Sequence, residues 1–128
     1  MLAGFGGSLG LDRDLAIMLG RGLGSGMGQG SICGAVSGAF VILGLAGGKV
    51  SGDERNTRSK TYALCRKFSE RFMERHKALL CSELLSVNPT TEAGKKEASE
   101  KKLIVTRCPR FVEDAARILN DLLSEKEL

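Results

Sequence analysis

The sequence is poor in aromatic rings and in histidine. Among 128 residues there is no tryptophan and one tyrosine, and aromatic residues make up 5% of the chain. Because nucleic-acid bases stack on such rings, we do not expect nucleic-acid binding. The single histidine, His76, rules out a two-histidine metal site within one chain and leaves little basis for a Ser-His-Asp hydrolase. We expect His76 to be solvated or to lie at a helix end.

The short cysteine motifs are also missing, although the chain has four cysteines. There is no C-x-x-C pair, which excludes a thioredoxin-type dithiol, a zinc knuckle and a ferredoxin run. There is no C-x-x-C-H either, so covalent haem is not expected. Any site that the cysteines share must therefore be assembled by the fold.

Nucleotide-binding motifs are absent despite many glycines. No G-x-G-x-x-G occurs, and Gly47-Gly48-Lys49 lacks both the earlier glycine and the following Ser or Thr of a P-loop. Glycines recur at every second position from Gly20 to Gly30, which is incompatible with a regular helix or strand interior. We interpret this segment as a structural loop that positions Cys33, with no nucleotide.

Long hydrophobic runs are missing too. No charged residue occurs from Gly22 to Gly48, but the dense apolar part, Ile32 to Ala46, is shorter than the roughly 20 residues of a membrane helix. We expect it to be a buried core helix and the protein to have no membrane contact. The N-terminus has neither the basic region nor the apolar stretch of a secretory signal, so a cytoplasmic location with reduced thiols is expected.

The length and the helical periodicity predict an all-α fold. We expect a compact single-domain bundle of about four to five helices covering residues 1–128, with a glycine-rich loop before the central helix. Residues 88–106 are predicted to be a flexible or irregular connection. The predicted helices are Asp12 to Leu19, Ile32 to Leu45 with Ser31 as its N-cap, Thr57 to Leu85, and a last helix beginning at Pro109 whose buried face includes Phe111, Val112, Ala115, Leu119, Leu122 and Leu123.

The four cysteines differ in their predicted surroundings. Cys33 falls in the first turn of the central helix and Cys108 at the N-cap of the last one, and both places favour the reactive thiolate. Cys65 lies on an apolar stripe and is expected to be core packing. Cys81 is predicted near the end of the same helix as Cys65, where either role is open.

A basic stripe, defined as Lys67, Arg71 and Arg75, follows the predicted third helix. It could attract an acidic protein partner or nucleic acid. Charged helix faces are, however, usually only solvated. We therefore expect a solvated face, with docking of an acidic partner by this basic helix as the alternative.

Several segments resemble the family named for its C-GCAxxG-C-C cysteine pattern. The resemblance starts with Gly26 to Leu45, including Ser31-Ile32-Cys33-Gly34-Ala35-Val36-Ser37-Gly38. Residues 68–72, the run Leu80-Cys81-Ser82-Glu83-Leu84-Leu85 and the run Cys108-Pro109-Arg110-Phe111 look like its later segments. The resemblance covers nearly the whole chain.

This resemblance implies a compact all-helical domain described as redox-active and related to the iron–sulfur-bearing part of a multihaem cytochrome. It implies that Cys33, Cys81 and Cys108 are the redox thiols and the candidate cofactor or metal ligands, and it does not include Cys65. The family's first cysteine lies upstream of the segment resembling Leu2 to Leu11, and no cysteine precedes Cys33 here. A four-thiolate site would have to recruit Cys65, a non-cysteine ligand or a partner.

The hypothesis we prefer is an electron-transfer or redox-sensing domain in which the three cysteines converge, with an iron–sulfur cluster or as reactive thiols. The alternatives are a non-catalytic helical interaction module with reduced structural cysteines, and a structural zinc site. The sequence does not decide whether the protein is an enzyme. A redox partner protein is implied, and the uncharged interval also predicts a homodimer.

Overall fold

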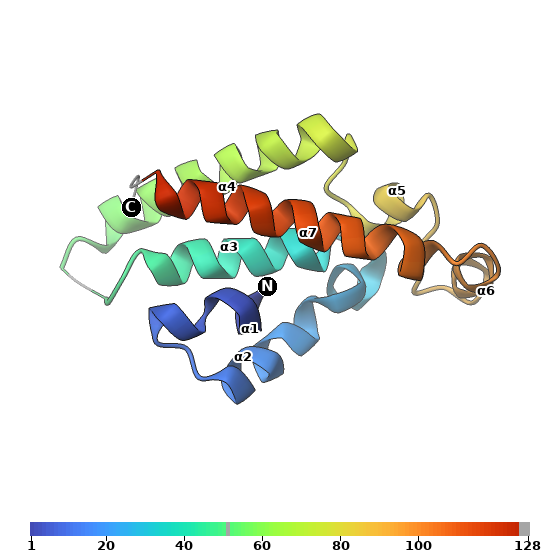
Figure 1. Ribbon diagram of the computed structural model, residues 1–128, viewed down its shortest axis with the longest axis horizontal. Helices are drawn as coiled ribbons and strands as arrows, with labels where there is room; N and C mark the ends of the chain where they lie inside the picture. The colour runs from blue at the N-terminus through green and yellow to red at the C-terminus, as the bar shows by residue number, and fades with distance from the viewer. Residues whose placement is uncertain (51, 126–128) are drawn as a thin grey trace.

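The structure is a computed structural model that describes residues 1–50 and 52–125 (Figure 1). It is all-α, as predicted, and these residues contain seven α-helices rather than four or five. Three further short segments, η1 (Gly7–Leu9), η2 (Arg21–Leu23) and η3 (Gly26–Gly30), are turns that are not α-helical. The seven α-helices are α1 (Leu2–Phe5), α2 (Arg13–Gly20), α3 (Gly34–Ala46), α4 (Glu54–His76), α5 (Cys81–Leu85), α6 (Glu92–Glu100) and α7 (Leu103–Ser124).

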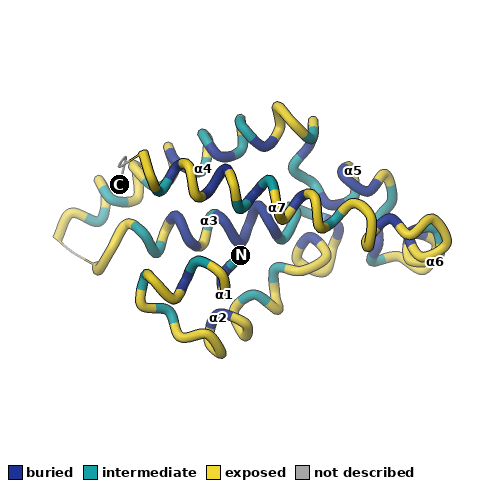
Figure 2. Tube along the Cα trace, in the orientation of Figure 1, coloured by how far each residue is buried: buried dark blue, intermediate teal, exposed yellow. Residues whose placement is uncertain are grey.

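Helix α3 is the centre of the fold, as its lack of charge predicts. Figure 1 shows it between α4 and α7 on one side and α1 and α2 on the other, and Figure 2 shows the buried residues concentrated along it. Val36, Ala39, Ile42 and Leu43 have no exposed surface. None of the helices in residues 1–50 and 52–125 has the length and hydropathy needed to cross a bilayer.

The predicted start of α3 is wrong by two residues. Its N-cap is Cys33, not Ser31, because Ile32 is held in an extended pairing with Leu80. The glycine of the first turn, Gly34, packs against the backbone carbonyl of Leu23. The first turn of the central helix is therefore in contact with the glycine-rich segment.

Helix α2 forms where its sequence predicts. The carboxylate of Asp12 accepts a hydrogen bond of 3.1 Å from the backbone N–H of Leu15, which caps the helix. Apart from Ala16 its side chains are not buried, and Leu15, Met18 and Leu19 are each about half exposed. Self-association, expected from the uncharged interval that follows α2, stays a prediction.

The predicted helix from Thr57 to Leu85 is two helices. Lys77 has a φ of 66°, and its N–H binds the carbonyl of Met73, so α4 ends in a left-handed cap. The chain then runs extended to Leu80 before α5 begins. Cys81 is consequently the first residue of α5 and does not share a helix with Cys65.

Residues 88–106, predicted to be an irregular connection, contain α6 and the start of α7. The Thr91 hydroxyl accepts a 3.0 Å hydrogen bond from the N–H of Gly94 and caps α6. Gly94 lies so close to the carbonyl oxygen of Asn88 that a β-carbon would overlap it. A local cap and a close backbone approach therefore give this charged stretch a fixed helical structure.

Helix α7 begins at Leu103 and not at Pro109, which lies inside it. Proline lacks the N–H that would bond to the carbonyl four residues earlier, and its ring crowds that carbonyl. For Pro109 this is the carbonyl of Val105 in the first turn, so the disturbance is confined to the start of α7. The predicted buried face is otherwise confirmed for Phe111, Ala115, Leu119 and Leu122. Val112, predicted to be buried, is 46% exposed, and Leu123 is partly buried.

The basic stripe of α4 faces α7 in part. Lys67 and Arg71 form ion pairs with Glu125 at 3.7 and 2.9 Å, and Arg75 binds Asp114 at 2.8 Å. Such exposed pairs contribute little stability individually. They show, however, that the stripe has partners within the chain.

Two glycines of α3 allow a matched test of its packing. A β-carbon at Gly38 would lie 2.9 Å from the β-carbon of Met1, whereas one at Gly44 would meet nothing within 4 Å. We expect Gly38→Leu to lower the free energy of unfolding by about 1 to 3 kcal/mol through overpacking. Gly44→Leu should be neutral or stabilising because leucine favours helix over glycine. Urea unfolding measures both, and equal stability of the two variants would contradict the packing.

Candidate functional site

A two-residue β-bridge places two of the cysteines. Ile32 pairs with Leu80 in antiparallel fashion, the N–H of Cys33 donates to the carbonyl of Leu79 at 2.9 Å, and the N–H of Cys81 donates to the carbonyl of Ser31 at 2.6 Å. Side chains alternate across such a pairing, so Cys33 and Cys81 lie on the same side of it as diagonal neighbours. Each cysteine then stands at the beginning of a helix.

The glycine-rich loop, predicted to position Cys33, packs against this bridge. Gly26 has a φ of 61°, and a β-carbon there would lie 2.4 Å from the nitrogen of Ser31 and 2.9 Å from the β-carbon of Cys81. Gly30 packs against the side chain of Asn88, and its carbonyl accepts a 3.0 Å hydrogen bond from the Ser82 hydroxyl. The loop is therefore in close contact with the segment that carries Cys81.

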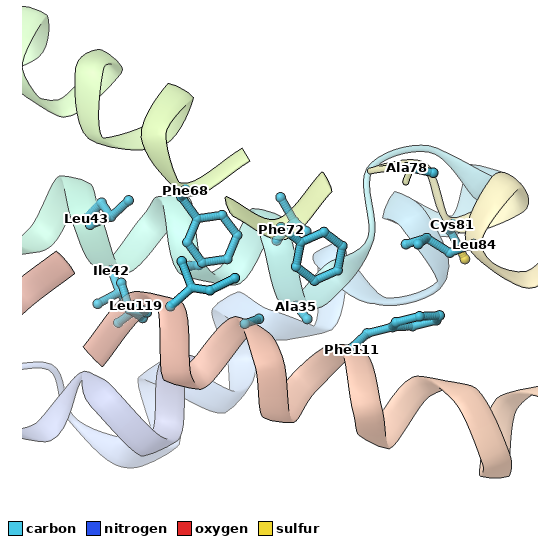
Figure 3. Close-up of a cluster of buried hydrophobic side chains, with 14 of the residues drawn as sticks. Ala35, Ile42, Leu43, Phe68, Phe72, Ala78, Cys81, Leu84, Phe111 and Leu119 are labelled. Atoms are coloured by element: carbon cyan, nitrogen blue, oxygen red, sulfur yellow. The ribbon is translucent and has the colours of Figure 1, made fainter. Parts of the chain in front are cut away.

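Helix α7 brings the third cysteine. Cys33, Cys81 and Cys108 line one cavity of about 230 Å³, which the structure thus assembles from three separate segments. Figure 3 shows Cys81 at the end of the apolar cluster, beside Leu84 and on the same side as the Phe111 ring. The remaining wall is mostly apolar and includes Ala35, Leu85, Pro89, Ile104, Phe111 and Val112.

The part of this wall that comes from residues 88–106 is not predicted by the sequence. Pro89 and Ile104 lie in the segment that is expected to be an irregular connection. A helical reading would have found Ile104, because it precedes Cys108 by four residues and Val112 follows by four, which puts all three on one helix face. No sequence signal pointed to Pro89.

Cys65 lies elsewhere. It is on α4, partly buried against the core, and it is not among the residues that line the three-cysteine cavity. Burial raises the pKa of its thiol, and the nearby charge of Arg66 lowers it to a smaller extent. Its predicted structural role is consistent with this position.

Burial opposes the thiolate form that is predicted for Cys33 and Cys108. Burial raises the pKa of Cys33 by more than the backbone N–H groups of Ala35 and Val36 at the start of α3 lower it. Burial also raises the pKa of Cys108, which lies inside α7 and not at its N-cap, so it gains nothing from a helix terminus. The effect of the helix N-terminus on the pKa is thus outweighed by burial at Cys33, and it does not apply to Cys108.

The three thiols also affect one another. Burial is the largest cause of the raised pKa of Cys81, and negative charge on Cys33 or Cys108 raises it further. Charge on Cys33 likewise raises the pKa of Cys108. Ionisation of one thiol therefore opposes ionisation of the others.

The donor set does not fit a complete metal or iron–sulfur site within this chain. Among residues 1–50 and 52–125, no three His, Cys, Asp or Glu side chains are arranged to hold a metal ion. An iron–sulfur cluster is typically held by four thiolates, and the fourth cysteine lies outside the cavity. The pocket presents three largely protonated thiols in an apolar setting.

The protein is a small helical domain in which cysteines from three separate segments meet at one pocket. This arrangement is that of a small cysteine-motif protein. The chain belongs to the C_GCAxxG_C_C family, whose model, described as "Putative redox-active protein (C_GCAxxG_C_C)", matches residues 1–122. Comparison with the curated proteins found no match, and comparison with the solved structures found none either.

The close contact at Gly26 predicts that alanine is not tolerated there. Alanine at a φ of 61° costs roughly 1–2 kcal/mol in the backbone alone, and its β-carbon would also displace Ser31 or Cys81. We expect Gly26→Ala to lower the free energy of unfolding by at least that amount and to speed alkylation of Cys81. Gly24→Ala is the control, because a β-carbon at Gly24 meets nothing within 4 Å and its φ is −63°. Similar losses in both variants would disprove the role of Gly26.

The raised thiol pKa values predict weaker folding at alkaline pH. The folded state holds the thiol protons of Cys33, Cys81 and Cys108 more tightly than the unfolded chain does. Their stabilisation is therefore fully present below about pH 8.5, the ordinary pKa of a cysteine, and is lost as the pH rises through the folded values. The free energy of unfolding should fall with pH in this range, and less steeply in Cys81→Ser. Identical slopes for the two proteins would refute this assignment.

Proposed function

We propose that the protein is a thiol redox protein in which Cys33, Cys81 and Cys108 exchange electrons with a partner that enters their shared cavity. The observation that carries this proposal is the convergence of three cysteines from three separate segments on one apolar pocket. The description of the family as redox-active supports it. A reducing compartment such as the cytoplasm suits this chemistry, because thiols stay available there.

The chemistry is thiol–disulfide exchange. The thiolate of one cysteine attacks a disulfide of the partner, forms a mixed disulfide and releases one partner thiol. A second cysteine then attacks the mixed disulfide, which leaves a protein disulfide and releases the second partner thiol. Two electrons and two protons have passed to the partner. The mutual effect of the thiols on their pKa values keeps the waiting cysteine protonated while the first one is charged.

An iron–sulfur cluster or a zinc ion would use the same cysteines. Since the donors present do not fit either group within the chain, we derive no step through them. Thiolate coordination would supply electron transfer in a cluster, or structural support with zinc. Both are distinguished from thiol chemistry by the metal content of the purified protein.

The interaction-module alternative is less well supported by the surface. Its proposed docking feature was the basic stripe of Lys67, Arg71 and Arg75. These side chains already form ion pairs with Glu125 and Asp114 of the same chain. The positive charge that this stripe offers to an acidic protein partner is therefore smaller.

The proposal predicts a specific disulfide. Protein purified without oxygen and then treated with an excess of oxidised glutathione should form one intramolecular disulfide, which mass spectrometry of the digested protein locates. We expect it to join two of Cys33, Cys81 and Cys108. Replacing either partner with serine should abolish it, whereas Cys65→Ser should leave both the bond and its midpoint potential unchanged.

Three results would overturn this function. The first is a disulfide that requires Cys65, or none at all with the other thiols unreactive in folded protein. The second is iron with visible charge-transfer absorption in the anaerobic sample, which would assign the cysteines to a cluster. The third is colourless protein with stoichiometric zinc, which would assign them to a structural metal site.

A further inference from the structure

A second cavity, between the C-terminal end of α4 and the middle of α7, has no role in the thiol chemistry. Its volume is about 630 Å³, and its wall carries four arginines and two carboxylates. Because the arginines outnumber the carboxylates, the wall has a surplus of positive charge. The lining residues are Arg75, His76, Leu84, Arg107, Arg110, Phe111, Glu113, Asp114 and Arg117. We call it the arginine pocket.

Two residues of the pocket wall, His76 and Asp114, are fixed by their contacts. His76 is the last residue of α4, as its predicted helix-end position suggested, and its Nε2 lies 2.8 Å from Oδ2 of Asp114. The imidazole packs against two phenylalanine rings, with centroids 4.6 Å from Phe72 and 5.0 Å from Phe111. The side chains of His76 and Asp114 are only 15% and 18% exposed.

The carboxylates are already engaged. Asp114 accepts from Arg75 through Oδ1 at 2.8 Å and faces His76 through Oδ2, so both of its oxygens have partners. Glu113 pairs with Arg117 at 2.6 Å. These pairs leave neither carboxylate as an unpaired negative charge in the pocket.

Two arginines keep free donors. Arg107 gives a single long hydrogen bond of 3.4 Å to the carbonyl of Leu84, and Arg110 has no hydrogen bond or ion pair with any described residue. They stand three residues apart on α7, which puts them on the same helix face. A guanidinium has five N–H donors in a fixed planar fork that matches phosphate and carboxylate groups.

We propose that the arginine pocket binds a small, multiply charged anion, such as the phosphate or carboxylate groups of a low-molecular-weight ligand, through Arg107 and Arg110. The volume lies in the range of small-molecule sites. A small ligand is favoured over an acidic protein, because the charged side chains line a concavity whose wall also includes the buried Phe111 and Leu84. The proposal does not depend on the thiol chemistry.

The test uses pyrophosphate and citrate as probes, which separate phosphate from carboxylate recognition. Isothermal titration calorimetry with the whole protein, at constant ionic strength set with chloride, should show saturable binding of at least one of them. We expect Arg110→Gln and Arg107→Gln each to weaken binding by about tenfold or more, since each removes charge-assisted hydrogen bonds.

Arg58→Gln is the matched control, because it removes the same charge from an exposed site on α4 outside the pocket. It should leave the affinity unchanged, and thermal melting without ligand should show that all three variants fold. Equal weakening by Arg58→Gln, or no saturable binding of either probe, would overturn the proposal. So would an acidic peptide that binds through Arg107 and Arg110 when neither probe does. Failure of the redox proposal would not alter any of these readouts.

Discussion

The pairing of Ile32 with Leu80 is the contact on which the cysteine pocket depends. Two backbone hydrogen bonds across this pairing join the N-terminus of α3 to the N-terminus of α5, and they make Cys33 and Cys81 diagonal neighbours. The pairing needs the glycine loop to come within contact distance of Ser31, which only a residue without a β-carbon allows at position 26. Gly26 thus serves the geometry of the thiols, whereas a β-carbon at Gly22, Gly24 or Gly28 would meet nothing within 4 Å.

Elements with strong periodicity or clear caps were predictable from the sequence. The uncharged core helix, the position of α2 and the buried stripe of α7 around Leu119 follow from local pattern. The break at Lys77 did not, because a lysine in a left-handed conformation carries no sequence signal of the kind that glycine gives. Pro109 was misleading because proline is tolerated in the second turn as well as at the first helical position.

The candidate site was predictable in its members but not in its electrostatics. Family resemblance identified Cys33, Cys81 and Cys108, and the structure brings them to one cavity. The expectation of thiolates at helix termini is wrong at Cys108, because α7 begins at Leu103 and not at Pro109. At Cys33 it is outweighed by burial, which the local sequence pattern does not show. Burial depends on packing between segments distant in sequence. The arginine pocket was not predicted for the same reason, because its wall combines residues of separate helices, such as Arg75 of α4 and Arg110 of α7.

The assembly of the pocket from distant segments links redox state to folding. A disulfide between any two of its three cysteines would close a loop of dozens of residues and reduce the entropy of the unfolded chain. The oxidised protein would then be the harder one to unfold. By thermodynamic linkage, the tertiary structure that gathers the thiols also makes their disulfide more difficult to reduce than the same pair in an unfolded chain. The reduction potential is thus a property of the whole domain.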